Sequence, residues 1–161
     1  MAVLVLFWVA SLLHMSILGR NLAGIYLHGS AAFGCFRWQT SDIDLLVAVH
    51  APPSSRQKEG LVRTLLAQGT AAPPAGFEMS VVLVRYCRQF VWPVPYELHF
   101  SNMHRASFEK DLSAACARIH GTDKDLAAHF AVTRAAGVTL WGESPRTMFC
   151  AIPPGAYKAA I

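Results

Sequence analysis

The chain has 161 residues, which fits one domain that is long enough to bury a core. Its composition is 53% hydrophobic and only 15% charged, so large apolar surfaces are expected to meet a missing segment, a partner or a membrane. The net charge of +4 is spread along the chain without a block of Lys and Arg, which argues against nucleic acid as a partner.

An apolar segment over residues 3–18 lies at the start of the sequence. No Lys or Arg precedes it, His14 interrupts it and no small-residue cleavage site follows, so it lacks the pattern of a secretory signal. It is also shorter than the roughly 20 residues that span a bilayer. We therefore expect a helix that packs on a sheet, no membrane contact, a cytoplasmic location, and an exposed apolar surface that favours self-association.

Strands and helices are predicted to alternate along the rest of the chain. Gly19 is suited to end the first helix, and two prolines restrict the segment 91–101 to the edge of a sheet. Strands are predicted over 22–29, 42–49, 77–84, 91–101 and 138–142. Helices are predicted over 31–36 as one or two turns, over 55–68, over 124–136 with Thr122 or Asp123 as N-cap, from Ser144 and Pro145, and within 152–161.

The cysteines and histidines show no spacing typical of a metal site. No two cysteines form a CxxC pair, which predicts reduced thiols at Cys35, Cys87, Cys116 and Cys150. No HxxxH pair occurs among the histidines either, so a zinc site is not expected.

Two aspartates, Asp42 and Asp44, open the second predicted strand. Because side chains alternate along a strand, both are expected on one face, while Ile43 points to the other. Like charges at this distance repel each other unless a cation neutralises them, and hard ions such as Mg²⁺ prefer oxygen ligands. An isolated pair of this kind is more often a solvated loop or cap, but the apolar run after Asp44 places this pair on a buried strand. The pattern predicts a metal site.

A Gly-Ser pair, Gly29 and Ser30, directly follows the first predicted strand. Glycine permits close backbone approach, the N–H groups of a turn that leads into a helix bind phosphate, and the serine hydroxyl adds a donor. Gly-Ser alone is weak evidence. Combined with aspartates on an adjacent strand, it predicts a pocket for a metal and a nucleotide.

Glu78 is the third candidate carboxylate and lies near the start of the third predicted strand. If this strand pairs beside the second, Glu78 lies over the face that carries Asp42 and Asp44. There it could bind a metal or accept a proton from an attacking hydroxyl. Without the aspartates, a solvent-exposed strand glutamate would be the better interpretation.

These motifs resemble the nucleotidyltransferases of the DNA polymerase beta superfamily, in which Gly-Ser precedes Asp-x-Asp and a later carboxylate. The chain is more closely similar to the aminoglycoside 3''-nucleotidyltransferases that modify streptomycin and spectinomycin. From about Leu22 onward, the segments in the family's order are YLHGSA, SDIDLLV, FEMSVV, PYELHFS, DKDLA and LWG. The resemblance implies an α+β nucleotidyltransferase fold with a small mixed sheet flanked by helices.

The resemblance also implies how ATP is bound. Gly29 and Ser30 would hold the triphosphate, and Ser41 would assist them. Asp125, within DKDLA, matches a family position at the nucleotide site. An acid at a helix N-terminus that interacts with the helix dipole is an equally good interpretation of Asp125.

The chemistry implied by the resemblance is the transfer of AMP from ATP to a hydroxyl of an aminoglycoside or aminocyclitol antibiotic. Asp42 and Asp44 would bind Mg²⁺, and Glu78 would be the catalytic base. Without the resemblance, the three carboxylates indicate the same reaction class but name neither ATP nor the antibiotic.

The sequence departs from the family pattern in its length and its apolar start. We expect a nucleotidyltransferase domain over 1–150 and, over 151–161, the start of a C-terminal helical domain that is missing or truncated. Two alternatives remain open: a minimal nucleotidyltransferase that modifies a protein or an RNA, and a non-catalytic nucleotide-binding remnant.

Overall fold

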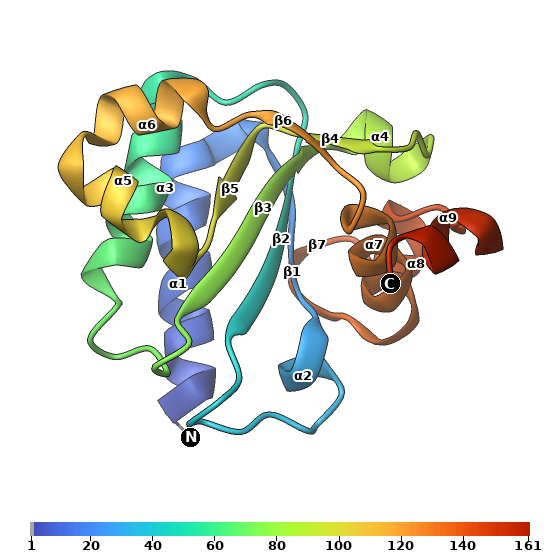
Figure 1. Ribbon diagram of the computed structural model, residues 1–161, viewed down its shortest axis with the longest axis horizontal. Coiled ribbons are helices and arrows are strands. Elements are labelled where there is room, and N and C mark those ends of the chain that lie inside the picture. Colours follow the sequence, from blue (N-terminus) through green and yellow to red (C-terminus); the bar gives the residue numbers. More distant parts are fainter. Residues whose placement is uncertain (1) are drawn as a thin grey trace.

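A computed structural model describes the backbone of residues 2–161 and the side chains of Leu6 and of residues 8–161. Its centre is a five-stranded sheet with the order β5-β3-β2-β1-β7 (Figure 1). β2 and β3 pair in parallel, and the other neighbours pair antiparallel. The sheet comprises β1 (Leu22–Leu27), β2 (Ile43–Val49), β3 (Phe77–Leu83), β5 (Leu98–Phe100) and β7 (Val138–Gly142).

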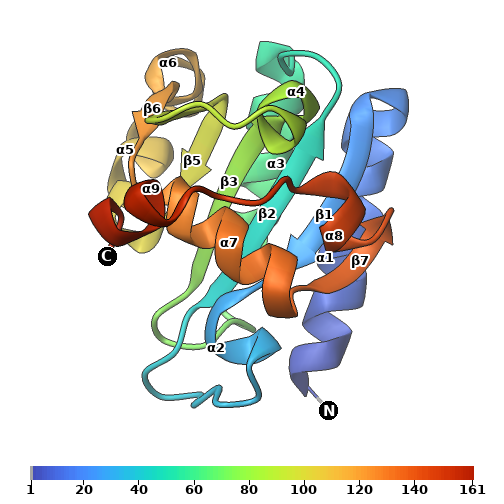
Figure 2. The same cartoon turned by 90° about the vertical axis from the view of Figure 1, so that its right-hand side faces the viewer.

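Helices cover both faces of this sheet (Figures 1 and 2). The first face carries α1 (Ala2–Leu18), α3 (Ser55–Ala67), α5 (Arg105–Lys110) and α6 (Leu112–Arg118). The second face carries α4 (Val84–Arg88), α7 (Leu126–Ala136), α8 (Pro145–Met148) and α9 (Pro154–Ala159). A short helix, α2 (Gly29–Ala32), follows β1. The expected α+β architecture, a small mixed sheet flanked by helices, is confirmed.

Because side chains alternate along the central strands, these strands contribute residues to two separate hydrophobic cores. The odd-numbered residues of β2 pack beneath α1 and α3: Ile43, Leu45, Val47 and Val49. The even-numbered residues Leu46 and Ala48 pack beneath α7 with Leu126 and Phe130. Even-numbered polar residues at the start of β2 and β3 therefore share the face on which α7 lies.

Two predicted segments differ from the structure, and two helices were not predicted. The segment 91–101 forms two strands: β4 (Val94–Tyr96), which pairs with β6 (Gly121–Asp123) in a second small sheet, and β5 at the edge of the main sheet. Residues 105–118, for which no element was expected, form α5 and α6. The predicted helix 124–136 begins at Leu126, because Asp123 belongs to β6 and its carboxylate accepts a hydrogen bond from the Asp125 N–H.

Helix α1 packs on the sheet with one side only. Leu6, Ala10 and Leu18 are buried, whereas Trp8 and Leu12 are 67% and 57% exposed, so the expected exposed apolar face is present. Within residues 2–161, no helix is both long enough and apolar enough to cross a bilayer.

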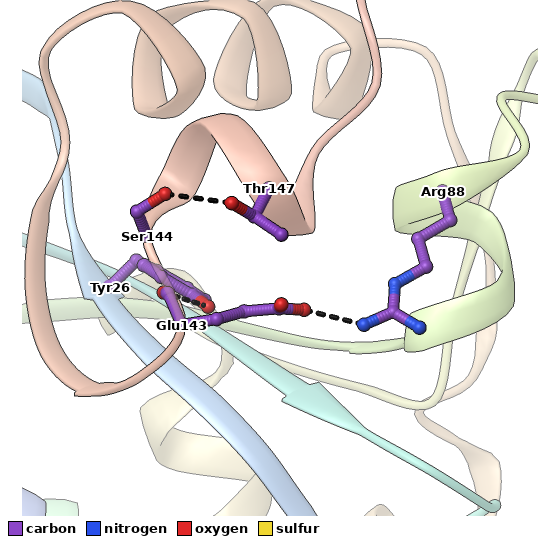
Figure 3. A network of polar contacts seen from close by, with 5 residues as sticks. All are labelled: Tyr26, Arg88, Glu143, Ser144 and Thr147. Carbon is purple, nitrogen blue, oxygen red and sulfur yellow. Dashed lines mark hydrogen bonds and ion pairs between the residues drawn. The ribbon is translucent and has the colours of Figure 1, made fainter.

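A polar network ties β7 and α8 to the rest of the sheet (Figure 3). The hydroxyl of buried Tyr26 donates to the backbone carbonyl of Glu143 at 2.9 Å. The Glu143 carboxylate also pairs with Arg88 of α4 at 2.5 Å. Both contacts hold the chain after β7 against the second face, where α7 and α8 cover the core.

Candidate active site

Three carboxylates meet where β2 and β3 begin. Asp42 directly precedes β2, and Asp44 lies beside Glu78 in the parallel register of the two strands. One carboxylate oxygen of each residue lies within 4.8 Å of the corresponding oxygens of the other two. The sequence predicted that these residues share a face, and the structure brings all three together.

Burial and mutual repulsion make this cluster unfavourable without a cation. Burial, followed by the charges of Asp42 and Glu78, raises the pKa of Asp44 to about 7. Burial also raises the pKa of Glu78, as do the nearby charges of Asp42, Asp123 and Asp125. A bound divalent cation would neutralise the charges that cause this repulsion, and oxygen-only donor sets suit hard ions such as Mg²⁺.

The Gly-Ser turn packs directly against the carboxylates. Gly29 has a φ of +62°, and a Cβ at this position would overlap the Asp44 carboxylate. The His28 N–H donates to the backbone carbonyl of Asp44 at 3.1 Å, which joins the turn to β2. The Ser30 hydroxyl oxygen is buried and has no hydrogen-bond partner among the described residues. The turn therefore carries a buried, unpaired hydroxyl on the residue after the glycine that packs on Asp44.

Ser41 closes the loop that leads to the aspartates. Its hydroxyl oxygen accepts a hydrogen bond from the Arg37 N–H at 3.0 Å, and its own N–H donates to the Arg37 carbonyl at 2.8 Å. Both hydrogen bonds of Ser41 are thus made within the loop itself. That Ser41 assists phosphate binding stays a prediction.

A pocket of about 480 Å³ opens beside the carboxylates. Its lining is polar and includes Asp42, Glu78, His99, Asp123, Asp125 and His129. Gly29, Ser30 and Asp44 do not line it. Asp125 therefore shares a pocket with Glu78, and its role toward the nucleotide stays a prediction.

Two of the pocket histidines lie near other rings. The ring of His99 lies next to the ring of His104, with centroids 5.5 Å apart, and the rings of His28 and His129 lie 5.0 Å apart. Burial lowers the pKa of His99 and of His129. Neutral imidazoles and carboxylates thus line one polar pocket.

The comparison with solved structures identifies the architecture. The crystal structure of spectinomycin adenyltransferase AAD(9) from Enterococcus faecialis, with ATP and spectinomycin, matches this chain with a TM-score of 0.80 and 17% sequence identity. The match covers 95% of this chain. The chain has a nucleotidyltransferase fold.

The match confirms the structural resemblance to adenylyltransferases that the motifs predicted. The chain spans 62% of the length of the AAD(9) chain. A toxin-antitoxin structure with AMP-PNP also matches, with 18% identity over 83% of this chain and 73% of that chain, but its TM-score of 0.39 is too low to support an argument. No family model matches the sequence.

The sequence interpretation did not identify His99, His129 or Asp123 as residues of the site. Each lies in or next to a segment that resembles the family. His99 lies in PYELHFS, Asp123 opens DKDLA, and His129 follows DKDLA by two residues. A signal was therefore present for the two histidines, because each interrupts apolar neighbours in the sequence, whereas Asp123 lies in a polar segment. Their convergence with Glu78 in this nucleotidyltransferase fold depends on strand pairing that the sequence does not reveal.

Proposed function

We propose that the protein transfers AMP from Mg-ATP to a hydroxyl of an aminoglycoside or aminocyclitol such as streptomycin or spectinomycin, and so confers antibiotic resistance. The observation that carries this proposal is the cluster of Asp42, Asp44 and Glu78 beside the Gly29 turn, in a nucleotidyltransferase fold. The AAD(9) structure was solved with ATP and spectinomycin, which supports the choice of substrates.

The residues present fit a divalent cation. Asp42 and Asp44 would hold Mg²⁺, and their proximity and the raised pKa of Asp44 indicate a site that favours positive charge. When bound, Mg²⁺ would neutralise charge on the phosphoryl oxygens. Gly29 lets the turn pack directly against the Asp44 carboxylate, and the unpaired hydroxyl of Ser30 would supply a donor to a phosphate.

Glu78 is proposed as the base. Its carboxylate takes the proton of the acceptor hydroxyl while that oxygen forms a bond to the α-phosphorus of ATP. The bond from the α-phosphorus to the bridging oxygen of the β-phosphate breaks, and pyrophosphate leaves. The raised pKa of Glu78 suits proton abstraction near neutral pH, because a general base works best when its pKa lies close to the working pH.

The remaining assignments concern the nucleotide and the chain as a whole. Ser41 and Asp125 are proposed to assist nucleotide binding. Residues 1–150 are proposed as the nucleotidyltransferase domain and 151–161, which include α9, as the start of a helical segment. Because the reaction consumes ATP, we place the protein in the cytoplasm.

Pyrophosphate release tests this function. The protein is incubated with ATP and Mg²⁺, with and without streptomycin or spectinomycin, and the drug is examined by mass spectrometry for addition of AMP. Glu78→Gln should lose at least 100-fold in rate, as removal of a general base typically does, whereas Glu109→Gln, an exposed change on α5, should have no effect.

The same assay separates the alternatives. If AMP is transferred to a protein or an RNA and no modified drug is found, the acceptor substrate is a macromolecule and not an antibiotic. If the protein binds ATP in the presence of metal but transfers AMP to no acceptor, it is a nucleotide-binding protein without transferase activity.

A further inference from the structure

The order of the strands gives the acidic cluster two distinct sides. β1, which leads into the Gly29 turn, lies on one side of β2 and β3, and β5 lies on the other. The pocket of about 480 Å³ is lined by Glu78 and by His99 of β5, but Gly29 and Ser30 do not line it. The pocket therefore opens at the part of the cluster that carries Glu78, next to β5.

His99 is held in place by a buried serine. The antiparallel register pairs His99 with Ser80, which lies two residues after Glu78 on the same face of β3. The Ser80 hydroxyl and His99 Nδ1 are 3.0 Å apart, and Ser80 is 3% exposed. Because Nδ1 is engaged, Nε2 is the ring nitrogen that can contact a ligand. No hydrogen bond from Nε2 to a described residue is present.

The position of His99 distinguishes it from a metal ligand. Within the described part of the chain, the cluster that could hold a metal consists of Asp42, Asp44 and Glu78 and does not include His99. Burial and the neighbouring His104 lower the pKa of His99, so its ring is neutral near pH 7. A neutral imidazole can form a hydrogen bond with a hydroxyl group in either direction.

We propose that His99 binds the acceptor substrate and orients its hydroxyl beside Glu78, and that Ser80 is the positioning residue for the His99 ring. This inference rests on the proposed function. In-line transfer requires the acceptor and the leaving pyrophosphate on opposite sides of the α-phosphorus. The pocket that holds His99 is also lined by Glu78, the proposed base, which suits the acceptor.

Kinetics of four variants test the proposal with the drug that the wild type modifies. His99→Ala should raise the KM for the drug about tenfold, the usual effect of one lost hydrogen bond, while the KM for ATP and the Mg²⁺ requirement stay unchanged. His99→Gln should recover part of the affinity, and Ser80→Ala should give an intermediate KM. His120→Ala, on an exposed loop, is the matched control and should behave as wild type.

Calorimetric titration of Mg-ATP into wild type and His99→Ala can overturn the proposal even if the wild type modifies neither drug. Unchanged ATP affinity in His99→Ala supports a place on the acceptor side, whereas a tenfold loss of ATP affinity overturns it. With an active wild type, a His99→Ala variant with an unaltered KM for the drug also overturns the proposal. A wild type that binds Mg-ATP but modifies no drug refutes the proposed antibiotic substrate instead.

Discussion

Replacement of Asp44 by asparagine should stabilise the metal-free protein above neutral pH. Burial and the charges of Asp42 and Glu78 raise the pKa of Asp44 from 3.8 to about 7 in the folded state. Because the folded-state pKa exceeds the unfolded value, the contribution of Asp44 to stability is fully present below pH 3.8 and is lost as the pH rises through 7. At pH 8 the ionised carboxylate opposes folding, whereas asparagine is neutral at every pH.

The size of the effect follows from the pKa. A change from 3.8 to about 7 corresponds to roughly 4 kcal/mol, at about 1.4 kcal/mol per pH unit. Asp44 is only partly buried, and screening by solvent reduces the expected gain to about 2 kcal/mol at pH 8. Toward pH 4 the gain should shrink, because Asp44 is then protonated in the folded state and the pH lies close to its unfolded pKa of 3.8.

Urea denaturation of wild type and Asp44→Asn at pH 4, 6 and 8, in the presence of a chelator, measures this difference. Glu109→Gln on the exposed side of α5 is the control and should show no comparable dependence on pH. Added Mg²⁺ should stabilise the wild type at pH 8 and leave Asp44→Asn unchanged, since a ligand stabilises only the state that binds it. A variant that is less stable than wild type at pH 8, or a difference that is the same at all three pH values, would refute the electrostatic reasoning.

Three further substitutions test the contacts of the Gly29 turn and the polar network around Tyr26. Gly29→Ala should lower the free energy of unfolding by about 2–4 kcal/mol, because of strain at positive φ and overlap with a carboxylate. Gly34 also has a positive φ but open space around it, so Gly34→Ala should cost only about 1–2 kcal/mol in the same urea denaturation assay. Equal losses would show that the turn is not packed on the cluster. Ser30→Ala removes an unpaired hydroxyl, so the free energy of unfolding should stay within about 0.5 kcal/mol of wild type. The same substitution should weaken Mg-ATP binding in calorimetry. A large loss of stability would mean that the hydroxyl has a partner in the protein. Tyr26→Phe should cost about 1 kcal/mol in thermal unfolding, because the Glu143 carbonyl loses its donor; a neutral substitution would contradict that bond.

The strands and the carboxylates are predictable because their signals are local. Alternation along one strand places Asp42 and Asp44 on the same face, and the Gly29 turn follows β1 directly. Glu78 joins them on one further assumption, that β3 pairs beside β2, and the structure has this pairing. Each of these inferences depends on adjacent residues or on a single strand contact.

The histidines of the pocket depend on contacts between distant segments. His99 reaches the site through the antiparallel pairing of β5 with β3, and His129 arrives on α7 from another part of the chain. Helices α5 and α6 were missed because each is short and Asp111 ends one and caps the next, which interrupts any helical periodicity. Such features follow from tertiary packing rather than from local pattern.

The proposed reaction requires that Asp42 and Asp44, beside Glu78, share a cation through which ATP is bound next to the Gly29 turn. Isothermal titration of ATP into the wild type and into Asp42→Asn, with and without Mg²⁺, tests it most directly. We expect binding that requires Mg²⁺ and that disappears in Asp42→Asn. An unchanged affinity in the variant, or ATP binding that is indifferent to Mg²⁺, would contradict it.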